Sequence, residues 1–188
     1  MGLIFEILKK NNFDTDKNTN HSYALIYDDL FENLFDKEIK LLEIGIDKGG
    51  SIQLWQEVFP KGKFTFIDIT DKNIPEQIRK KIDEKQNCIF IIENAYIENT
   101  SNKIVDTFDI IIDDGPHTLN SFIALLNLYL PKVKINGYLI IEDLIDLSWM
   151  DELKKHIPSN FSIDIYNGLN TIDDRLLILK NKNLDKTK

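Results

Sequence analysis

Short apolar runs recur along the chain, and each run ends in acidic or small residues. Stretches with helical spacing of apolar positions separate most of these runs. The runs predict strands at Lys40–Ile44, 63–67, Cys88–Ile92, 109–112 and 138–141. Runs of this kind are typical of parallel strands that helices cover on both faces. The alternation therefore predicts a doubly wound, Rossmann-like α/β domain with a mostly parallel sheet.

Two later runs, at 161–166 and 176–180, have only a loop between them. The loop is too short for a crossover helix, so the two runs predict an antiparallel pair that closes the sheet. Helical spacing predicts helices at 25–35, 52–58, 122–129 and 149–156. An apolar face left exposed on the first of these helices would support a homodimer.

The bulk properties narrow the class of protein. With 188 residues and 43% hydrophobic residues, the chain can form one domain, which we expect at 1–180 and to include a helical segment at 1–36. We expect a disordered tail at 181–188. The net charge of −8 argues against a nucleic-acid partner. No apolar run reaches the roughly 18 residues that span a bilayer, so we expect no membrane insertion and a cytoplasmic location.

The one cysteine, Cys88, lies in the apolar run CIFII. A single cysteine forms no internal disulfide and no multi-cysteine metal site. We expect Cys88 to be buried and unreactive, because thiolate chemistry needs a polar, electropositive setting.

Carboxylates follow each of the first five predicted strands. In an open parallel sheet, ligands bind beyond the carboxyl ends of the strands. A single carboxylate there would be a helix cap or a turn residue, but the repetition predicts a binding site. The strand-end residues are Glu43 with Gly45, Asp68, Glu93 with Asn94, Asp113 with Asp114, and Glu142 with Asp143.

The loop after the first strand reads LLEIGIDKGGS, and its glycines allow a tight turn before a helix that begins near Ser51. The spacing is neither that of a dinucleotide fingerprint nor that of a P-loop. It suits a nucleoside that carries a sulfonium and an amino acid tail. Asp68 follows at the distance expected of a residue that accepts hydrogen bonds from ribose hydroxyls. Gly49 and Asp68 could instead serve only as turn or cap residues.

Four segments together resemble the class I S-adenosylmethionine-dependent methyltransferases, and among them the metal-dependent sugar O-methyltransferases of the macrolide and rhamnosyl type. The segments are DTDKNTNHSYALIYDDLF, LLEIGIDKGGSIQLWQEVFP, FDIIIDDGPHT and NGYLIIEDL, which lie within residues 14–144. DDGPH combined with IED at this spacing is the most specific part. The family's first motif usually reads Gly-Thr-Asp-Lys, whereas this chain has Asp14 in place of the glycine.

The resemblance implies a seven-stranded sheet whose last strand is antiparallel, with S-adenosylmethionine over the first two strands. Adenine is then expected near Asn94, Ala95 and Tyr96. Lys17 could reach the cofactor carboxylate or be an ordinary solvated lysine. The expected cofactor-binding residues are Thr15, Lys17, Glu43, Gly45, Gly49, Ser51, Asp68, Asn94, Ala95 and Asp113.

The resemblance also implies a divalent metal held by Asp114, Glu142 and Asp143, with Asp114 and His117 as catalytic residues and His117 as the general base. Such an all-carboxylate set suits Mg²⁺, Mn²⁺ or Ca²⁺ better than zinc, and we expect Mg²⁺. A bound cation would also explain how so many close carboxylates coexist. In the simpler alternatives, residues 113–116 form only a strand-ending turn, Glu142 and Asp143 only open a helix, and His117 only begins one.

The expected activity is methylation of a sugar hydroxyl in the biosynthesis of a bacterial polysaccharide or a glycoside, with a sugar or glycoside small molecule as the acceptor. A catechol-like diol or another small-molecule oxygen is an alternative acceptor. A cofactor-binding module without catalysis is the alternative from another class of protein. Tyr23, Tyr27, Trp55 and Trp149 are expected to be packing residues.

Overall fold

The computed structural model describes residues 2–84, 87–168 and 170–183 and contains a seven-stranded sheet with the strand order β3-β2-β1-β4-β5-β7-β6. Both the α/β class and the number of strands agree with the prediction. The strands are β1 (Lys40–Ile44), β2 (Lys63–Asp68), β3 (Cys88–Ile92), β4 (Phe108–Asp113), β5 (Val133–Ile141), β6 (Phe161–Asn167) and β7 (Arg175–Asn181).

Strands β1 to β5 are parallel to one another, and β7 is antiparallel to both of its neighbours, β5 and β6. The expected antiparallel last strand is therefore confirmed. Ile44 of β1 pairs with Ile67 of β2 and with Asp113 of β4. This register brings the carboxyl ends of the central strands to one edge, where the sequence predicts the site.

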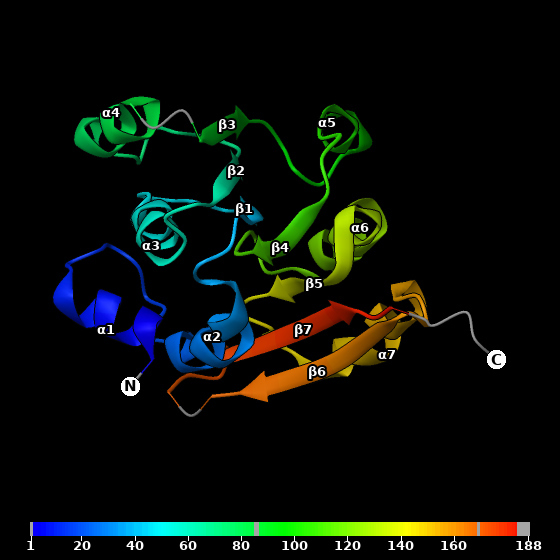
Figure 1. The fold of residues 1–188 in the computed structure, drawn as a ribbon. Coiled ribbons are helices and arrows are strands. Elements are labelled where there is room, and N and C mark those ends of the chain that lie inside the picture. The colour runs from blue at the N-terminus through cyan, green and yellow to red at the C-terminus, as the bar shows by residue number, and fades with distance from the viewer. Residues whose placement is uncertain (1, 85–86, 169, 184–188) are drawn as a thin grey trace.

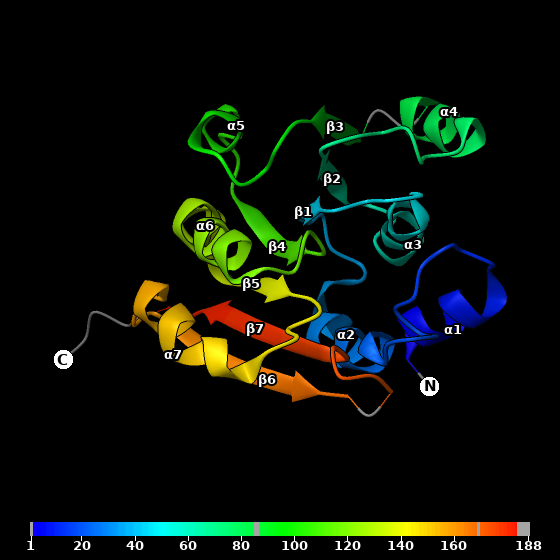
Figure 2. The ribbon, with the colours of Figure 1, turned by 180° about the vertical axis from the view of Figure 1, so that it is seen from behind.

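Helices cover both faces of the sheet, as Figures 1 and 2 show from opposite sides. One core cluster joins one face of the sheet to α1–α4, and a second joins the other face to α6 and α7. Neighbouring residues of one strand serve different clusters, since Leu41 packs in the first and Leu42 in the second. The helices are α1 (Leu3–Lys10), α2 (Tyr23–Phe31), α3 (Gly50–Val58), α4 (Glu76–Glu84), α5 (Glu98–Lys103), α6 (Leu119–Tyr129) and α7 (Met150–Leu153).

Several elements differ from their predicted bounds. Strand β5 begins at Val133, five residues before the predicted strand, because its first residue pairs with Phe108 across a register shift. The predicted helix at 149–156 is a single α-turn, α7, between two 3₁₀ turns. Cys88 is only partly buried, although we expected full burial.

Two further predictions concern the first long helix and the C-terminal end of the chain. The apolar side of α2 is buried within the chain through Tyr23, Tyr27 and Phe31, whereas Leu25 is half exposed. The predicted tail at 181–188 begins inside β7, and residues 184–188 lie outside the described part of the chain.

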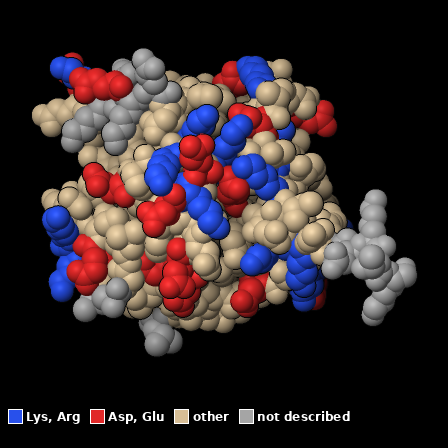
Figure 3. All heavy atoms as spheres, viewed as in Figure 1, with Lys and Arg blue, Asp and Glu red and all other residues tan. Residues whose placement is uncertain are grey.

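The face shown in Figure 3 carries basic side chains interspersed with acidic ones. Within the described residues, the helices are all too short or too polar to cross a membrane.

Candidate active site

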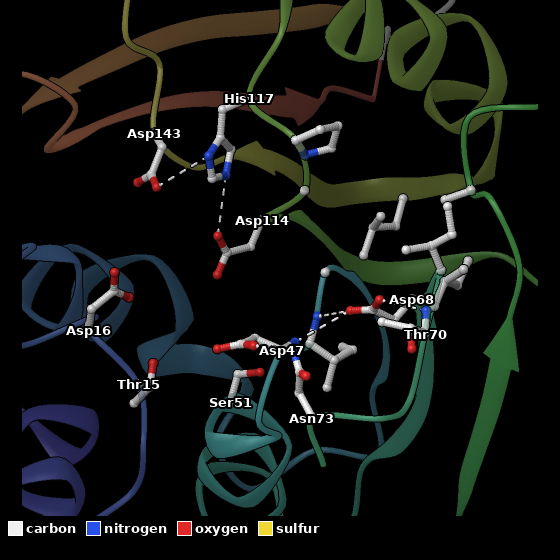
Figure 4. A pocket seen from close by; sticks show the side chains of 18 of the residues that line it. Thr15, Asp16, Asp47, Ser51, Asp68, Thr70, Asn73, Asp114, His117 and Asp143 are labelled. Atoms are coloured by element: carbon white, nitrogen blue, oxygen red, sulfur yellow. Dashed lines mark hydrogen bonds and ion pairs between the residues drawn. The ribbon is translucent and has the colours of Figure 1, made fainter.

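A cavity of about 800 Å³ lies at the carboxyl edge of the sheet (Figure 4). Its volume is within the range of small-molecule sites. It is lined by the loops after β1 to β5 and by the segment between α1 and α2. The predicted site residues that line it are Thr15, Gly45, Ser51, Asp68, Asn94, Ala95, Asp114, His117 and Asp143.

Five predicted site residues do not line this cavity. Gly49 caps the start of α3 in a left-handed conformation, with φ +80°. The side chains of the other four are buried behind the cavity wall. These four residues are Lys17, Glu43, Asp113 and Glu142.

The loop after β1 is held against the ends of two neighbouring strands. Asp68 at the end of β2 accepts a hydrogen bond from the backbone N–H of Ile46 at 2.8 Å, and its other oxygen accepts one from Thr70 N–H at 3.0 Å. Gly45 has φ +86°, and a Cβ there would lie 1.9 Å from the carbonyl oxygen of Asp114. Glycine at this position therefore meets two needs: a left-handed backbone and a close approach of two chains.

We expect Gly45→Ala to lower the free energy of unfolding by about 3–5 kcal/mol, because strain at positive φ adds to a clash with rigid backbone. Gly49→Ala is the matched control. It has a similar φ of +80°, but a Cβ there would meet the nearest atom, a side-chain methyl of Ile78, at 3.2 Å. We expect this control to cost about 1–2 kcal/mol. Urea unfolding of both variants measures the difference, and equal losses would contradict the close packing of Gly45 on the backbone of Asp114, just after β4.

Asp114, His117 and Asp143 form the acidic end of the cavity. His117 Nε2 lies 3.4 Å from Asp114 Oδ1, and His117 Nδ1 lies 3.6 Å from Asp143 Oδ2 (Figure 4). One potential ligand atom from each of the three residues lies within 4.8 Å of the others. The two carboxylate oxygens at this spacing could help to hold a cation of the kind that prefers hard oxygen ligands, with the imidazole of His117 beside it.

Three of the cavity residues have positive φ although they are not glycines: Asp47 at 41°, His117 at 50° and Asp143 at 54°. Asp and His tolerate the left-handed region better than most residues, but the conformation still costs about 1 kcal/mol or more. Such conformations tend to cluster at functional sites. The cavity is therefore marked by unusual backbone conformations as well as by its polar side chains.

Lys17 is buried, with 1% of its surface exposed, and lies among carboxylates. Its Nζ donates to Glu142 Oε2 at 2.7 Å and to Asp114 Oδ2 at 3.0 Å, and it lies 3.9 Å from Glu43 Oε1. Burial alone would lower the pKa of Lys17, but these three negative charges raise it well above its usual value. Lys17 is therefore neither solvated nor directed at the cavity.

Two tyrosines of α2 complete the polar contacts behind the cavity. Tyr27 OH donates a short hydrogen bond to Glu142 Oε1, and Tyr23 OH donates to Asp143 Oδ1 at 2.6 Å. Sequence reasoning assigned both tyrosines to packing and missed this role. The spacing of four residues, which places both rings on one face of α2, was the signal that could have found it.

His21 is a further residue whose contacts the sequence did not predict. Its side chain is 6% exposed, with Nδ1 3.2 Å from Asp16 Oδ2 and 3.6 Å from Asp143 Oδ1. Its Nε2 lies 3.7 Å from Asp173 Oδ1 in the loop between β6 and β7. Burial lowers the pKa of His21, but the surrounding carboxylates outweigh this effect and raise it to about 9. His21 is therefore a buried cation that ties the segment before α2 to the two later loops.

Burial also changes the protonation of carboxyl groups behind the cavity. It raises the pKa of Asp113 to about 7, although Asp113 accepts a hydrogen bond from Tyr96 OH at 2.6 Å. Burial likewise raises the pKa of Glu43 to about 7, against the opposing charge of Lys17. By contrast, Lys17 and His117 outweigh the burial of Asp114 and hold its pKa well below the usual range.

No protein-family model matches the sequence. Solved structures do match the fold. MycE methyltransferase from the mycinamycin biosynthetic pathway, solved with Mg, SAH and mycinamycin VI, superposes with a TM-score of 0.76 at 19% sequence identity, over 94% of this chain and 54% of that one. The SAH-bound Podospora anserina methyltransferase PaMTH1 superposes with a TM-score of 0.65 at 15% identity, over 97% of this chain and 90% of that one. The chain therefore has the class I methyltransferase fold.

Proteins with similar sequences indicate the kind of methyltransferase that this chain resembles in sequence. Mycinamicin VI 2''-O-methyltransferase of Micromonospora griseorubida is 30% identical over 141 residues, which are 69% of this chain and 33% of that protein. Demethylmacrocin O-methyltransferase of Streptomyces fradiae is also 30% identical, over 69% of this chain and 33% of that protein. The chain is thus a relative of the sugar O-methyltransferases of the macrolide and rhamnosyl type, as the motifs indicate. It spans about a third of the length of these relatives.

Proposed function

We propose that the protein is an S-adenosylmethionine-dependent O-methyltransferase that uses a divalent cation to methylate a sugar hydroxyl. One observation carries the proposal: a single cavity joins the glycine loop and Asp68 at one end to Asp114, His117 and Asp143 at the other. The first end suits a nucleoside, and the second suits a cation and a reacting hydroxyl. The names of the sequence relatives support the same chemistry.

The donor would bind across the ends of β1 and β2. Asp68 would accept hydrogen bonds from the ribose hydroxyls, as carboxylates at this position do in nucleotide-binding sheets. Asn94, Ala95 and Tyr96 line the cavity beyond Asp68 and would contact adenine. The segment that carries Thr15 closes the cavity near Ser51 and would face the amino acid tail.

Asp68→Ala is expected to weaken S-adenosylmethionine binding by about 10- to 100-fold, the loss typical of hydrogen bonds to a charged acceptor. Asp71→Ala is the matched control, because Asp71 follows on the same loop, pairs with Arg79 and does not line the cavity. Calorimetric titration gives both dissociation constants. Equal constants for wild type and Asp68→Ala would rule out the ribose contact.

The residues present fit a hard divalent cation. Asp114 Oδ1 and Asp143 Oδ2 both face His117, and neither oxygen accepts a hydrogen bond from another described residue. These oxygens would hold Mg²⁺, whereas Glu142, which the sequence also suggests as a ligand, lies behind the cavity wall with its two oxygens engaged by Lys17 and Tyr27. A divalent ion bound there would supply positive charge that lowers the pKa of the acceptor hydroxyl and fixes its position.

His117 would act as the general base. Methyl transfer is an in-line displacement in which the C–O bond forms as the S–C bond breaks and S-adenosylhomocysteine leaves. The hydroxyl loses its proton as the new bond forms, and the imidazole of His117 lies in the cavity wall to accept it. A positioned base of this kind contributes about 10²–10⁴ in rate.

Mass spectrometry of candidate acceptors tests the proposed activity. Nucleotide sugars, glycosides and catechols are incubated with the protein, S-adenosylmethionine and Mg²⁺, with boiled protein as the control. We expect a gain of one methylene on a sugar. Methylation of catechols alone would contradict the sugar assignment, and no methylation of any acceptor would contradict the activity. The homodimer and the cytoplasmic location remain predictions.

A further inference from the structure

Lys17 is the buried group that the proposed reaction leaves without a role. It lies on the segment between α1 and α2, and its ammonium bridges Asp114 Oδ2 and Glu142 Oε2, 97 and 125 residues away along the chain. Burying a lysine is unfavourable unless its charge is compensated, and a pair of buried ions is often no more stable than apolar residues of the same volume. The stability of the fold therefore does not by itself explain a lysine here.

Each of the two bridged carboxylates is shared between Lys17 and another contact. Asp114 uses Oδ2 for Lys17, while its Oδ1 faces His117 at 3.4 Å. Glu142 uses Oε2 for Lys17, while its Oε1 accepts from Tyr27. Lys17 thus donates to the oxygens on the buried side. Asp114 Oδ1, on the cavity side, accepts no hydrogen bond from Lys17.

We propose that Lys17 is a positioning residue that shares Asp114 with the divalent cation, weakens cation binding and keeps the bound cation more electrophilic. The inference rests on the proposed function and deepens it. A fixed positive charge repels a second cation bound to the same carboxylate, and the repulsion is strong in a partly desolvated site. Carboxylates that accept hydrogen bonds from an ammonium also donate less charge to a metal ion. Lys17 would thereby lower the affinity of the site for the cation and raise the reactivity of the cation that binds.

Lys17→Met tests this role, because methionine has a similar length and no charge. We expect the dissociation constant for Mg²⁺, measured by calorimetry without S-adenosylmethionine, to fall by about 10-fold or more, since one repelling charge is gone. At saturating Mg²⁺ we expect kcat to fall by a similar factor. A lysine that only supported the fold would weaken Mg²⁺ binding and kcat together, or change neither.

Two variants serve as controls. Lys17→Arg keeps the charge and is expected to keep Mg²⁺ affinity within about 3-fold of wild type. Lys40→Met removes a partly exposed lysine that pairs with Asp106 at the opposite edge of the sheet, and it should leave both constants unchanged. If Lys17→Met does not fold, the double variant Lys17→Met/Glu43→Gln loses one charge of each sign and is measured in the same way.

The outcomes separate the inference from the function on which it rests. Wild-type protein that binds no Mg²⁺ would overturn both the proposed cation and the role of Lys17. Wild-type protein that binds Mg²⁺, with equal or weaker binding by Lys17→Met, would overturn the inference alone. Tighter Mg²⁺ binding together with lower kcat in Lys17→Met supports it.

Discussion

Replacing His117 by asparagine is expected to reduce the turnover of methyl transfer by a factor of about 10²–10⁴, because the reaction loses its proton acceptor. Asparagine is the informative replacement. His117 has φ +50°, a conformation that asparagine tolerates and alanine does not, so the backbone of the cavity is preserved. Single-turnover kinetics at saturating S-adenosylmethionine measure the rate of the chemical step directly.

The binding of S-adenosylmethionine by His117→Asn should be within a few-fold of wild type, because the donor contacts proposed here lie on other loops. Loss of binding together with turnover would mean that His117 supports the shape of the cavity. Turnover equal to that of wild type would exclude His117 as the base.

Removing divalent cations is the second change with a large expected effect. Dialysis against EDTA should lower turnover by about 10²-fold or more, since a bound cation contributes several kcal/mol of transition-state stabilisation. Mg²⁺ should restore the activity and Zn²⁺ should not, because carboxylate oxygens are hard ligands. Methyl-transfer assays before and after the addition of each metal provide the measurement. Full activity in EDTA would contradict a catalytic cation.

The sheet could be predicted from the sequence because its central strands are buried on both faces and therefore read as continuous apolar runs. Helix α4 was harder to recognise, since EQIRKKIDE has few apolar positions to mark a face. Helix α5 is six residues long, ENTSNK, and has no apolar position at all. The sequence therefore predicts the elements that are long and have a regular pattern of apolar residues, and it does not reveal short or polar helices such as α4 and α5.

The position of the site could be predicted because parallel strands bring their carboxyl ends together. The sequence does not reveal which of the site's carboxylates face the cavity and which are buried behind it. Asp114 and Asp143 face the cavity, whereas Glu142 turns toward Lys17 and Tyr27. These contacts join residues more than 100 positions apart, so no local pattern encodes them.

The left-handed conformations of His117 and Asp143 are also visible only in three dimensions. Their residue types allow the conformation, but the same types occur in many ordinary turns. The sequence therefore predicted which residues gather at the sheet edge, and the structure adds how their backbones direct them.

The central claim is that the cavity holds S-adenosylmethionine, and a thermal-shift titration tests it most directly. At a ligand concentration 100 times Kd, binding stabilises the folded state by about 2.7 kcal/mol. For a chain of this size that raises Tm by about 5–10 °C. We expect S-adenosylmethionine and S-adenosylhomocysteine to produce this shift and NADH and ATP to produce none. A larger shift with NADH or ATP, and none with S-adenosylmethionine, would contradict the account.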